Sequence, residues 1–302
     1  MRILVSGSTG LVGSALIRSL ESKDHEIVRL VRSTPVKGAN ESFWNPENGT
    51  LAADQLEGLD AVVHLAGESI AEGRWTAEKK ARIRESRLKG TRLLSDTLGQ
   101  LKRKPGVLVS ASAVGFYGSR GDEVLDEHSA SGSDFLAEVC REWELATQPA
   151  ALADVRVVNM RLGVILSGDG GALPKMLRPF KMGVGGKLGS GKQYLSWIAL
   201  DDVVGVIEHA IANDELRGPV NTVAPEPVTN YKFTKSLGHV LSRPTIFPVP
   251  AFAARLLFGE MADATLLASQ RAVPTRLNES GYSFRYPDLE GALRHALNKA
   301  SS

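Results

Sequence analysis

The sequence predicts an α/β protein: a doubly wound parallel sheet followed by a smaller C-terminal α/β substrate lobe. Three observations predict it. Short apolar runs alternate with longer helical patterns in the first half, a glycine-rich turn follows the first run, and the pattern changes after about residue 163. Continuous runs of valine, isoleucine and leucine between helices are typical of a parallel sheet that is covered on both faces.

The elements follow in chain order. Strands are predicted at residues 2–6, 26–32, 61–65, 107–110, 155–160 and 219–223. Helices are predicted at residues 11–22, about 76–98, 133–146, 201–212 and 230–241, and a last amphipathic helix begins after Tyr286-Pro287. Residues 167–193 are rich in glycine and lysine, which predicts a loop that covers a site. We expect a nucleotide-binding domain at 1–163 and the substrate lobe mainly at 164–302, with 194–223 returning to the sheet.

Composition excludes several classes of protein. The chain has 302 residues, a formal net charge of +2 and one cysteine. A single cysteine excludes an internal disulfide and a cysteine-rich zinc site, and the six histidines are scattered, so we expect no metal. No apolar stretch approaches the ~20 residues that cross a bilayer. We therefore expect a cytoplasmic protein that uses neither a membrane nor a nucleic acid as a partner.

The strongest motif is a G-x-x-G-x-x-G turn between the first predicted strand and helix. Its members are Gly7, Ser8, Thr9, Gly10, Leu11, Val12 and Gly13. Glycines there allow a tight turn and a close approach of the backbone to a pyrophosphate, and the helix N-terminus offers N–H groups to the phosphates. The alternative is a glycine-rich turn without a ligand. The context between strand and helix favours a Rossmann dinucleotide site formed by Gly7, Thr9, Gly10, Leu11, Val12 and Gly13.

The end of the second strand indicates which dinucleotide binds. Val31-Arg32-Ser33 carries no acidic residue to bind the ribose hydroxyls of NAD, and Arg32 is suited to bind a 2′-phosphate. The pattern therefore favours NADP over NAD, the alternative being that Arg32 is a solvated surface residue. Leu65, Ala66 and Gly67 end the next core strand, where small residues let a cofactor lie close to the backbone.

A basic run occupies residues 78–92, with seven basic and two acidic residues. A nucleic-acid surface is one interpretation. Because the bases point in several directions around a helix, a solvated surface is the interpretation we favour for most of them. Arg87 is the exception, for the reason given below.

Together these motifs resemble the extended short-chain dehydrogenases/reductases of the NAD(P)-dependent epimerase/dehydratase type. The resemblance is carried by DAVVHLAG at 60–67, RLGVIL at 161–166 and WIALDDV at 197–203. Within that family the chain resembles the YfcH-type, or SulA-like, epimerase family proteins. This second resemblance rests on GESI at 67–70, RWT at 74–76, SASAVGFYG at 110–118, GSGKQ at 189–193 and LASQRAVP at 267–274.

The resemblance implies NADP(H) binding and assigns residues to it. Arg32 would take the 2′-phosphate side, and Leu65 and Ala66 would line the adenosine side. Arg87 falls where typical members carry an asparagine that faces the cleft, so it would reach the cofactor. Val164 would lie near the nicotinamide, the alternative being an ordinary core valine.

The sequence departs from the family pattern at the residues that transfer protons in typical members. Typical members use a serine or threonine with a Tyr-x-x-x-Lys pair. Alignment on Glu144 puts Leu136 at the tyrosine position and Cys140 at the lysine position. Ser112 and Tyr117 remain as candidate catalytic residues, although a phenol without a neighbouring cation is a poor base. Cys140 is either a reactive thiol or a buried small hydrophobe.

Two functions stay open at this point. The first is an NADP(H)-dependent oxidoreductase that acts on an unidentified small molecule without the usual tyrosine and lysine. The second is a non-catalytic NADP(H)-binding sensor or scaffold. A homodimer is considered for both, and the substrate and the reaction direction are not predicted.

Overall fold

The computed structural model describes residues 1–298 and contains one large sheet of eight strands. In spatial order the strands are β12 (Gly218–Thr222), β8 (Arg156–Leu162), β6 (Val107–Ala113), β5 (Ala61–His64), β1 (Arg2–Ser6), β2 (Glu26–Val31), β3 (Glu41–Asn45) and β4 (Thr50–Leu51). All neighbours are parallel except β3 and β4. The predicted fold class is confirmed.

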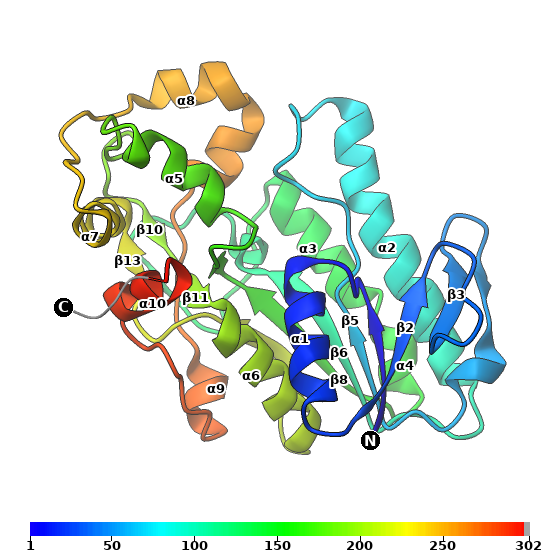
Figure 1. Cartoon of the computed structure of the whole chain (residues 1–302). Coiled ribbons are helices and arrows are strands. Elements are labelled where there is room, and N and C mark those ends of the chain that lie inside the picture. The colour runs from blue at the N-terminus through cyan, green and yellow to red at the C-terminus, as the bar shows by residue number, and fades with distance from the viewer. Residues whose placement is uncertain (299–302) are drawn as a thin grey trace.

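Helices cover both faces of this sheet (Figure 1). On one face, α1 (Leu11–Glu21) and α6 (Leu200–Ala212) pack on β1, β5, β6 and β8 through a core that includes Ile3, Leu16 and Ile207. On the other, α2 (Ala77–Gln100) and α4 (Gln148–Leu152) pack through Leu94, Leu98 and Ala150. The helix α3 (Phe135–Leu145) lies beside α2 and β6.

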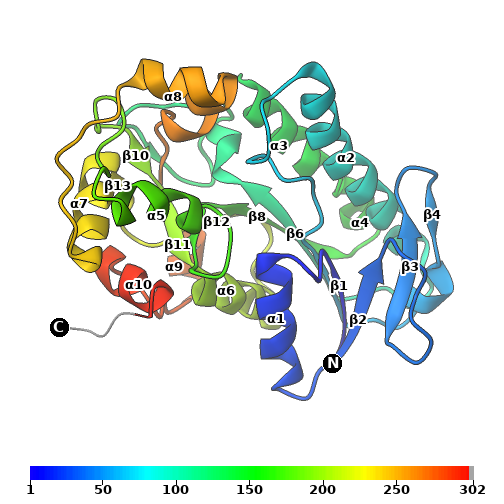
Figure 2. The ribbon, with the colours of Figure 1, turned by 45° about the horizontal axis from the view of Figure 1, so that its top comes forward.

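The C-terminal lobe has its own core. Its short strands are β9 (Val164–Leu166), β10 (Tyr194–Leu195), β11 (Trp197–Ala199) and β13 (Val228–Thr229), and its helices are α5 (Leu173–Lys181), α7 (Asn230–Leu241), α8 (Ala251–Phe258) and α10 (Leu289–Ala296). The short helix α9 (Thr275–Glu279) instead packs on β12, and its Leu277 belongs to the core of the large sheet. Two further short strands, β7 (Val124–Leu125) and β14 (Arg271–Ala272), pair with each other. Trp197, Phe180 and Leu237 belong to this second core. Figure 2 shows the helices of the lobe beside the large sheet.

Most predicted elements occur within two or three residues of their expected ends, and α5 is the main difference. The sequence predicts a loop there because residues 167–193 are rich in glycine and lysine. Pro174 lies in the first turn, where a missing N–H costs nothing, and Pro179 lies close to the end of the helix at Lys181. Burial of Leu173, Leu177 and Phe180 on one face stabilises the helix. β3, β4, α4, α8 and α9 were also not predicted.

The division into domains at 163/164 stays a prediction, and residues 299–302 of the predicted lobe lie outside the described residues. β12 joins the large sheet beside β8, and α6 packs on that sheet. None of the helices in residues 1–298 is both long and apolar enough to span a membrane. In the same part of the chain, no cluster of three or more histidine, cysteine or acidic side chains is placed to hold a metal ion.

Candidate nucleotide site and its surroundings

The glycine-rich turn is built so that only glycine fits at its key positions. Gly7 has a φ of 68°, a left-handed conformation, and a Cβ there would lie 2.9 Å from the backbone carbonyl of Leu65. A Cβ on Gly13 would lie 2.2 Å from the carbonyl oxygen of Gly7. The Gly10 amide closes the turn by donating to that same oxygen at 3.0 Å. The turn therefore packs directly on the end of β5, with α1 beginning against it.

Three backbone N–H groups at the start of α1 have no partner within the helix. Its first hydrogen bond runs from the Ser14 amide to the Gly10 carbonyl at 2.9 Å, so the amides of Leu11, Val12 and Gly13 precede it. Gly10 offers no side-chain cap, and the first turn contains no acidic residue. A helix N-terminus with free N–H groups and no carboxylate is suited to bind a phosphate. Thr9 is exposed beside it.

The strand register brings the other predicted binding residues to the same edge. Ser6 lies opposite Leu30 of β2 and opposite His64 of β5. Val31-Arg32 and Leu65-Ala66 therefore continue past the edge of the sheet at the level of Gly7. The Arg32 side chain is exposed and makes no hydrogen bond or ion pair with another residue in 1–298. It is free to bind an anion at the end of β2.

A buried polar network holds the end of β5 in place. Ser6 Oγ accepts from the amides of Leu65 and Ala66 at 3.1 and 3.3 Å, and it also contacts His64 Nδ1 at 2.7 Å. Thr91 Oγ1 lies 3.0 Å from His64 Nε2 and accepts from Trp143 Nε1 at 2.8 Å. Burial lowers the pKa of His64 to about 4, so this imidazole is neutral at pH 7. The sequence motif included His64, but no local signal indicated Thr91 or Trp143.

The basic run is neutralised except at one position. Six of the seven bases form ion pairs: Lys79 and Arg82 with Glu68, Lys80 with Glu260, Arg84 with Glu142, Lys89 with Glu47 and Glu85, and Arg92 with Asp96. Arg87 makes no ion pair among residues 1–298. Its Nη1 donates to the carbonyls of Glu68 and Ile83 at 3.0 and 2.9 Å. The pairing explains why the run is not a continuous basic surface.

Arg87 reaches from α2 to the end of β5. Its guanidinium lies 4.9 Å from the ring of Trp143, and its Nη2 would lie 3.7 Å from a Cβ on Gly67. Burial lowers the pKa of this guanidinium, which nevertheless stays a cation at pH 7. The site thus contains one half-buried positive charge without an ion-pair partner in residues 1–298, where β5 meets α2 and α3, which lie side by side (Figure 2).

Ser112 and Tyr117 lie in a second buried network, next to this edge. Glu144 binds Arg161 through two hydrogen bonds of 2.8 and 2.9 Å, and it accepts from Ser112 Oγ at 2.7 Å. Tyr117 accepts from Arg161 Nη1 at 2.9 Å, and its hydroxyl contacts Asn221 Oδ1 at 2.7 Å and the Asp126 carbonyl. Both candidate catalytic hydroxyls therefore already donate to protein acceptors.

The environment of Tyr117 differs from that of a general base. Its side chain is fully buried, and burial raises its pKa to about 12 despite the nearby Arg161 cation. The phenol packs edge to face against Phe116, whose ring is covered by the Arg161 guanidinium. These contacts are typical of a tyrosine that stabilises the fold, and they do not favour a catalytic role for Tyr117.

Leu136 and Cys140 occupy one face of α3, one turn apart. Both lie beside Gly115: a Cβ there would be 3.5 Å from Leu136 Cβ and 3.8 Å from Cys140 Sγ. Burial first, and the Glu144 carboxylate second, raise the pKa of the Cys140 thiol to about 12. Of the two interpretations of Cys140, the structure favours the buried small hydrophobe over the reactive thiol.

We expect Cys140 to resist alkylation in the folded protein. With a pKa of about 12, its thiolate fraction at pH 8 is about a thousandfold below that of a free thiol, and burial blocks access as well. Iodoacetamide labelling followed by mass spectrometry measures this directly, because the chain has one cysteine. The same protein in guanidinium chloride is the control and should label at the rate of a free thiol. Fast labelling of the folded protein would show that the thiol is activated.

A loop from the C-terminal lobe covers the start of α1. Cβ atoms on Gly170 and Gly171 would lie 3.5 and 3.2 Å from the Leu11 side chain. At the other end of the loop, a Cβ on Gly168 would lie 2.3 Å from the carbonyl oxygen of Ala296. Val164 begins the short strand before this loop and is half buried against the second core. The predicted covering loop at 167–193 therefore reaches the glycine-rich turn with its first residues.

Comparison with protein families gives two matches. The NAD-dependent epimerase/dehydratase family matches residues 3–223, which include the glycine-rich turn, β5, Arg87 and β12. A domain of unknown function, DUF1731, matches residues 249–296, which form the end of the C-terminal lobe.

Several whole proteins are similar over nearly the full chain. Epimerase family protein MT2273 of Mycobacterium tuberculosis is 43% identical, with 98% of each chain covered. The crystal structure of human epimerase family protein SDR39U1 with NADPH has a TM-score of 0.91 at 33% identity and covers 99% of this chain and 100% of its own. A structure described as a nucleoside-diphosphate sugar epimerase from Corynebacterium glutamicum has a TM-score of 0.81 at 41% identity, covering 98% of this chain and 58% of that one.

Proposed function

This chain belongs to the NAD-dependent epimerase/dehydratase family, and on that premise we propose that it binds NADP(H) and transfers hydride between this cofactor and a small molecule. The observation that carries the proposal is the glycine-rich turn with three unpaired amides at the start of α1 and an unpaired arginine on the neighbouring strand. The similarity to a human protein whose structure contains NADPH supports the choice of cofactor.

Each part of this edge has a role in binding. The amides of Leu11, Val12 and Gly13 would bind the pyrophosphate, and Arg32 would bind the 2′-phosphate. The adenosine would be lined by Leu65, Ala66 and Val31. The backbone amides of Leu65 and Ala66 already donate to Ser6 Oγ, so they need no partner from the cofactor. Val164 would lie toward the nicotinamide. The bound cofactor would supply or accept the hydride.

Arg87 would provide the cation that Cys140 cannot. In typical family members the lysine of the Tyr-x-x-x-Lys pair supplies a positive charge beside the nicotinamide ribose. Here a guanidinium from α2 points at the same wall of α3, and Nη2 has no acceptor within residues 1–298. Arg87 thus would bind and orient the cofactor. Ser112 stays the candidate for contacting a substrate oxygen, which requires its hydrogen bond to Glu144 to break.

We expect Arg32→Ala to separate NADPH binding from NADH binding. Loss of a charge-assisted contact with phosphate should weaken NADPH binding about tenfold or more and leave NADH binding unchanged within about twofold. Isothermal titration with both cofactors measures the two affinities. Arg18→Ala is the matched control, since it removes an exposed arginine from the far end of α1. Equal losses for both cofactors would contradict the assignment of Arg32 to the 2′-phosphate.

A second function, a non-catalytic NADP(H)-binding protein, is favoured by one specific observation. Alignment on Glu144 puts Leu136 and Cys140 at the usual proton-transfer positions, and the hydroxyls of Ser112 and Tyr117 are both engaged by protein acceptors. A turnover assay separates the two functions: absorbance of NADPH is followed with a panel of carbonyl compounds and nucleotide sugars. Consumption that Arg87→Met and Ser112→Ala each reduce more than about tenfold supports hydride transfer. Tight binding without consumption of NADPH across the panel would favour the sensor.

A further inference from the structure

The C-terminal lobe concentrates positive charge in two segments. Residues 170–200 and 227–259 contain nine lysines and arginines and no acidic residue, although the whole chain carries a net charge of only +2. The bases are Lys175, Arg178, Lys181, Lys187, Lys192, Lys232, Lys235, Arg243 and Arg255. Arg178, Lys181, Lys192 and Arg243 form no ion pair with any of residues 1–298. Acidic neighbours outside the two segments, such as Asp263, already pair with a base.

The two segments lie side by side. Leu188 forms a parallel bridge with Val249, the Gly189 amide donates to the Val249 carbonyl at 2.8 Å, and the Val249 amide donates to the Lys187 carbonyl at 2.8 Å. A Cβ on Gly189 would lie 3.6 Å from Ala251, the first residue of α8. Figure 2 shows α5, α7 and α8 together on this side of the lobe. The two segments therefore lie against each other along residues 187–189 and 249–251.

The surface of these two segments exposes large apolar side chains. Nine of the fourteen exposed large hydrophobics among residues 1–298 lie in these two segments: Met182, Val184, Tyr231, Ile246, Phe247, Phe252, Leu256, Leu257 and Phe258. The helix α8 buries only Ala254 fully, while Phe252 and Leu256 are 70% and 71% exposed on one face. Apolar side chains gathered in this way on a protein surface indicate an interaction site.

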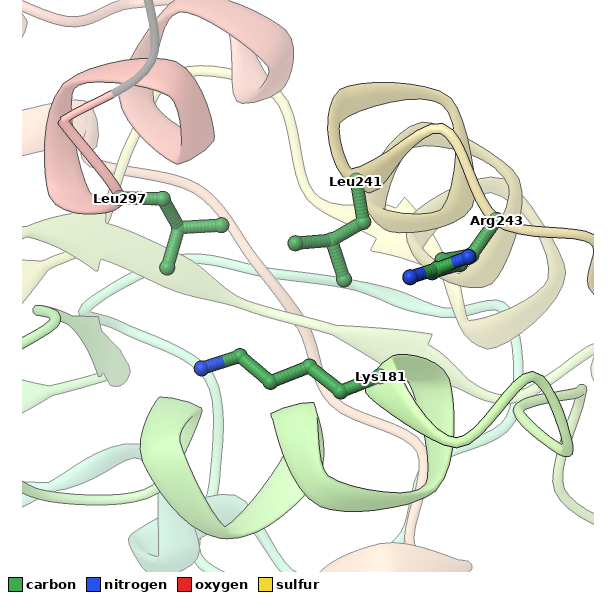
Figure 3. Close-up of a pocket in the computed structure, with 4 residues that line it drawn as sticks. All are labelled: Lys181, Leu241, Arg243 and Leu297. Atoms are coloured by element: carbon green, nitrogen blue, oxygen red, sulfur yellow. The ribbon is translucent and has the colours of Figure 1, made fainter.

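A cavity of about 350 Å³ adjoins this surface. It lies between α5, the end of α7 and the end of α10, and it is lined by Lys181, Leu241, Arg243 and Leu297 (Figure 3). The Lys181 side chain extends from α5 past Leu241 toward Leu297, and Arg243 lies beside Leu241 at the end of α7. A hollow with two unpaired cations and an aliphatic wall suits a group that is both anionic and apolar.

We propose that this surface of the C-terminal lobe docks on an anionic lipid membrane, with the side chains of α8 and of residues 246–247 entering the interface and the bases binding lipid phosphates. Exposed apolar side chains beside unpaired lysine and arginine, in segments that contain no acidic residue, are the pattern of a peripheral membrane surface. The sequence led us to expect no membrane partner because no segment spans a bilayer, and peripheral docking needs no such segment.

Charge favours a membrane over the other occupants. A second copy that bound through the same face would bring two acid-free basic surfaces together, and like charges across an interface are repulsive. A nucleic acid would satisfy the bases, but its charged phosphate backbone would give the exposed aliphatic side chains Ile246, Leu256 and Leu257 no apolar environment to enter.

Co-sedimentation with vesicles tests the proposal on the full-length protein. We expect binding to phosphatidylcholine vesicles that contain about one-third phosphatidylglycerol, and little binding to pure phosphatidylcholine. Lys181→Gln with Arg243→Gln should reduce the partition coefficient about tenfold or more, since each base near an anionic surface contributes about fivefold. Phe252→Ser with Leu256→Ser should also reduce it, and this effect should persist at high salt.

Matched variants and two further measurements decide between outcomes. Arg18→Gln and Leu152→Ser remove an exposed base and an exposed leucine outside the surface and should leave partitioning unchanged. NADPH affinity, measured in parallel, reports whether each variant is folded and does not depend on vesicle binding. Equal binding to neutral and anionic vesicles, or no binding to either, would overturn the proposal. So would a dimer in light scattering that Phe252→Ser with Leu256→Ser dissociates, or a duplex that binds where vesicles do not.

Discussion

Replacement of Gly7 by alanine is expected to weaken NADPH binding about a hundredfold, since a shift of about 1 Å in a preorganised site can cost that much. The new Cβ would lie 2.9 Å from the Leu65 carbonyl and 3.0 Å from the Ala66 amide, closer than carbon packs on backbone. The turn must move away from β5, which displaces the amides of α1 from the edge that Leu65 and Arg32 share. Fluorescence titration of NADPH measures the effect.

Gly49→Ala is the matched control for this change. Gly49 has a φ of 72°, close to the 68° of Gly7, but a Cβ there has no atom within 4 Å. Both variants therefore carry the cost of a left-handed alanine, about 1 kcal/mol, and only Gly7→Ala adds the contact with β5. If both variants bind NADPH equally well, close packing of the turn on β5 is not what forms the site.

Arg161→Met should lower the free energy of unfolding by about 3–5 kcal/mol, the range measured when one partner of a buried ion pair is removed. Glu144 would remain at 13% side-chain exposure with only the Ser112 hydroxyl as a donor, and Tyr117 would lose the guanidinium that donates to it. Urea denaturation followed by tryptophan fluorescence measures the change.

The exposed pair Arg92 and Asp96 gives the comparison. Its side chains are 60% and 43% exposed, so Arg92→Met should cost less than about 1 kcal/mol. The double variant Arg161→Met with Glu144→Leu removes both buried charges and should be more stable than Arg161→Met alone. If Arg161→Met lowered the free energy of unfolding as little as Arg92→Met, water would have to hydrate the Glu144 carboxylate in place of the Arg161 guanidinium.

The glycine-rich turn could be predicted because its requirements are local. Gly7, Gly10 and Gly13 meet within one turn of chain, between a strand and a helix that apolar periodicity identifies. The strand register then places Arg32 and Leu65 at the same edge, because parallel strands end together. The main parallel strands that form this edge, β1, β2 and β5, begin at their predicted residues.

The buried networks could not be predicted in the same way. Trp143 and Thr91 are 52 residues apart, and Tyr117 and Asn221 are 104 apart, so nothing near either residue indicates its partner. Tyr117 was a candidate catalyst because it follows Ser112 closely in sequence, but the 3-10 turn after β6 directs its side chain toward Arg161 and the interior. Ion pairing of the basic run likewise depends on acids from distant elements, such as Glu47 and Glu260.

The loop over the glycine-rich turn contacts both the start of α1 and the end of α10, which lie near opposite ends of the described chain. Gly170 and Gly171 pack on Leu11, while Gly168 packs on the last carbonyl of α10 at Ala296. We expect a ligand that orders the start of α1 to restrict this loop as well and, through Gly168, the end of α10. By linkage, whatever orders the end of α10 favours binding at the glycine-rich turn by the same free energy. The contact at Gly168 thus joins α10, the last helix of the lobe, to the loop that covers the nucleotide edge.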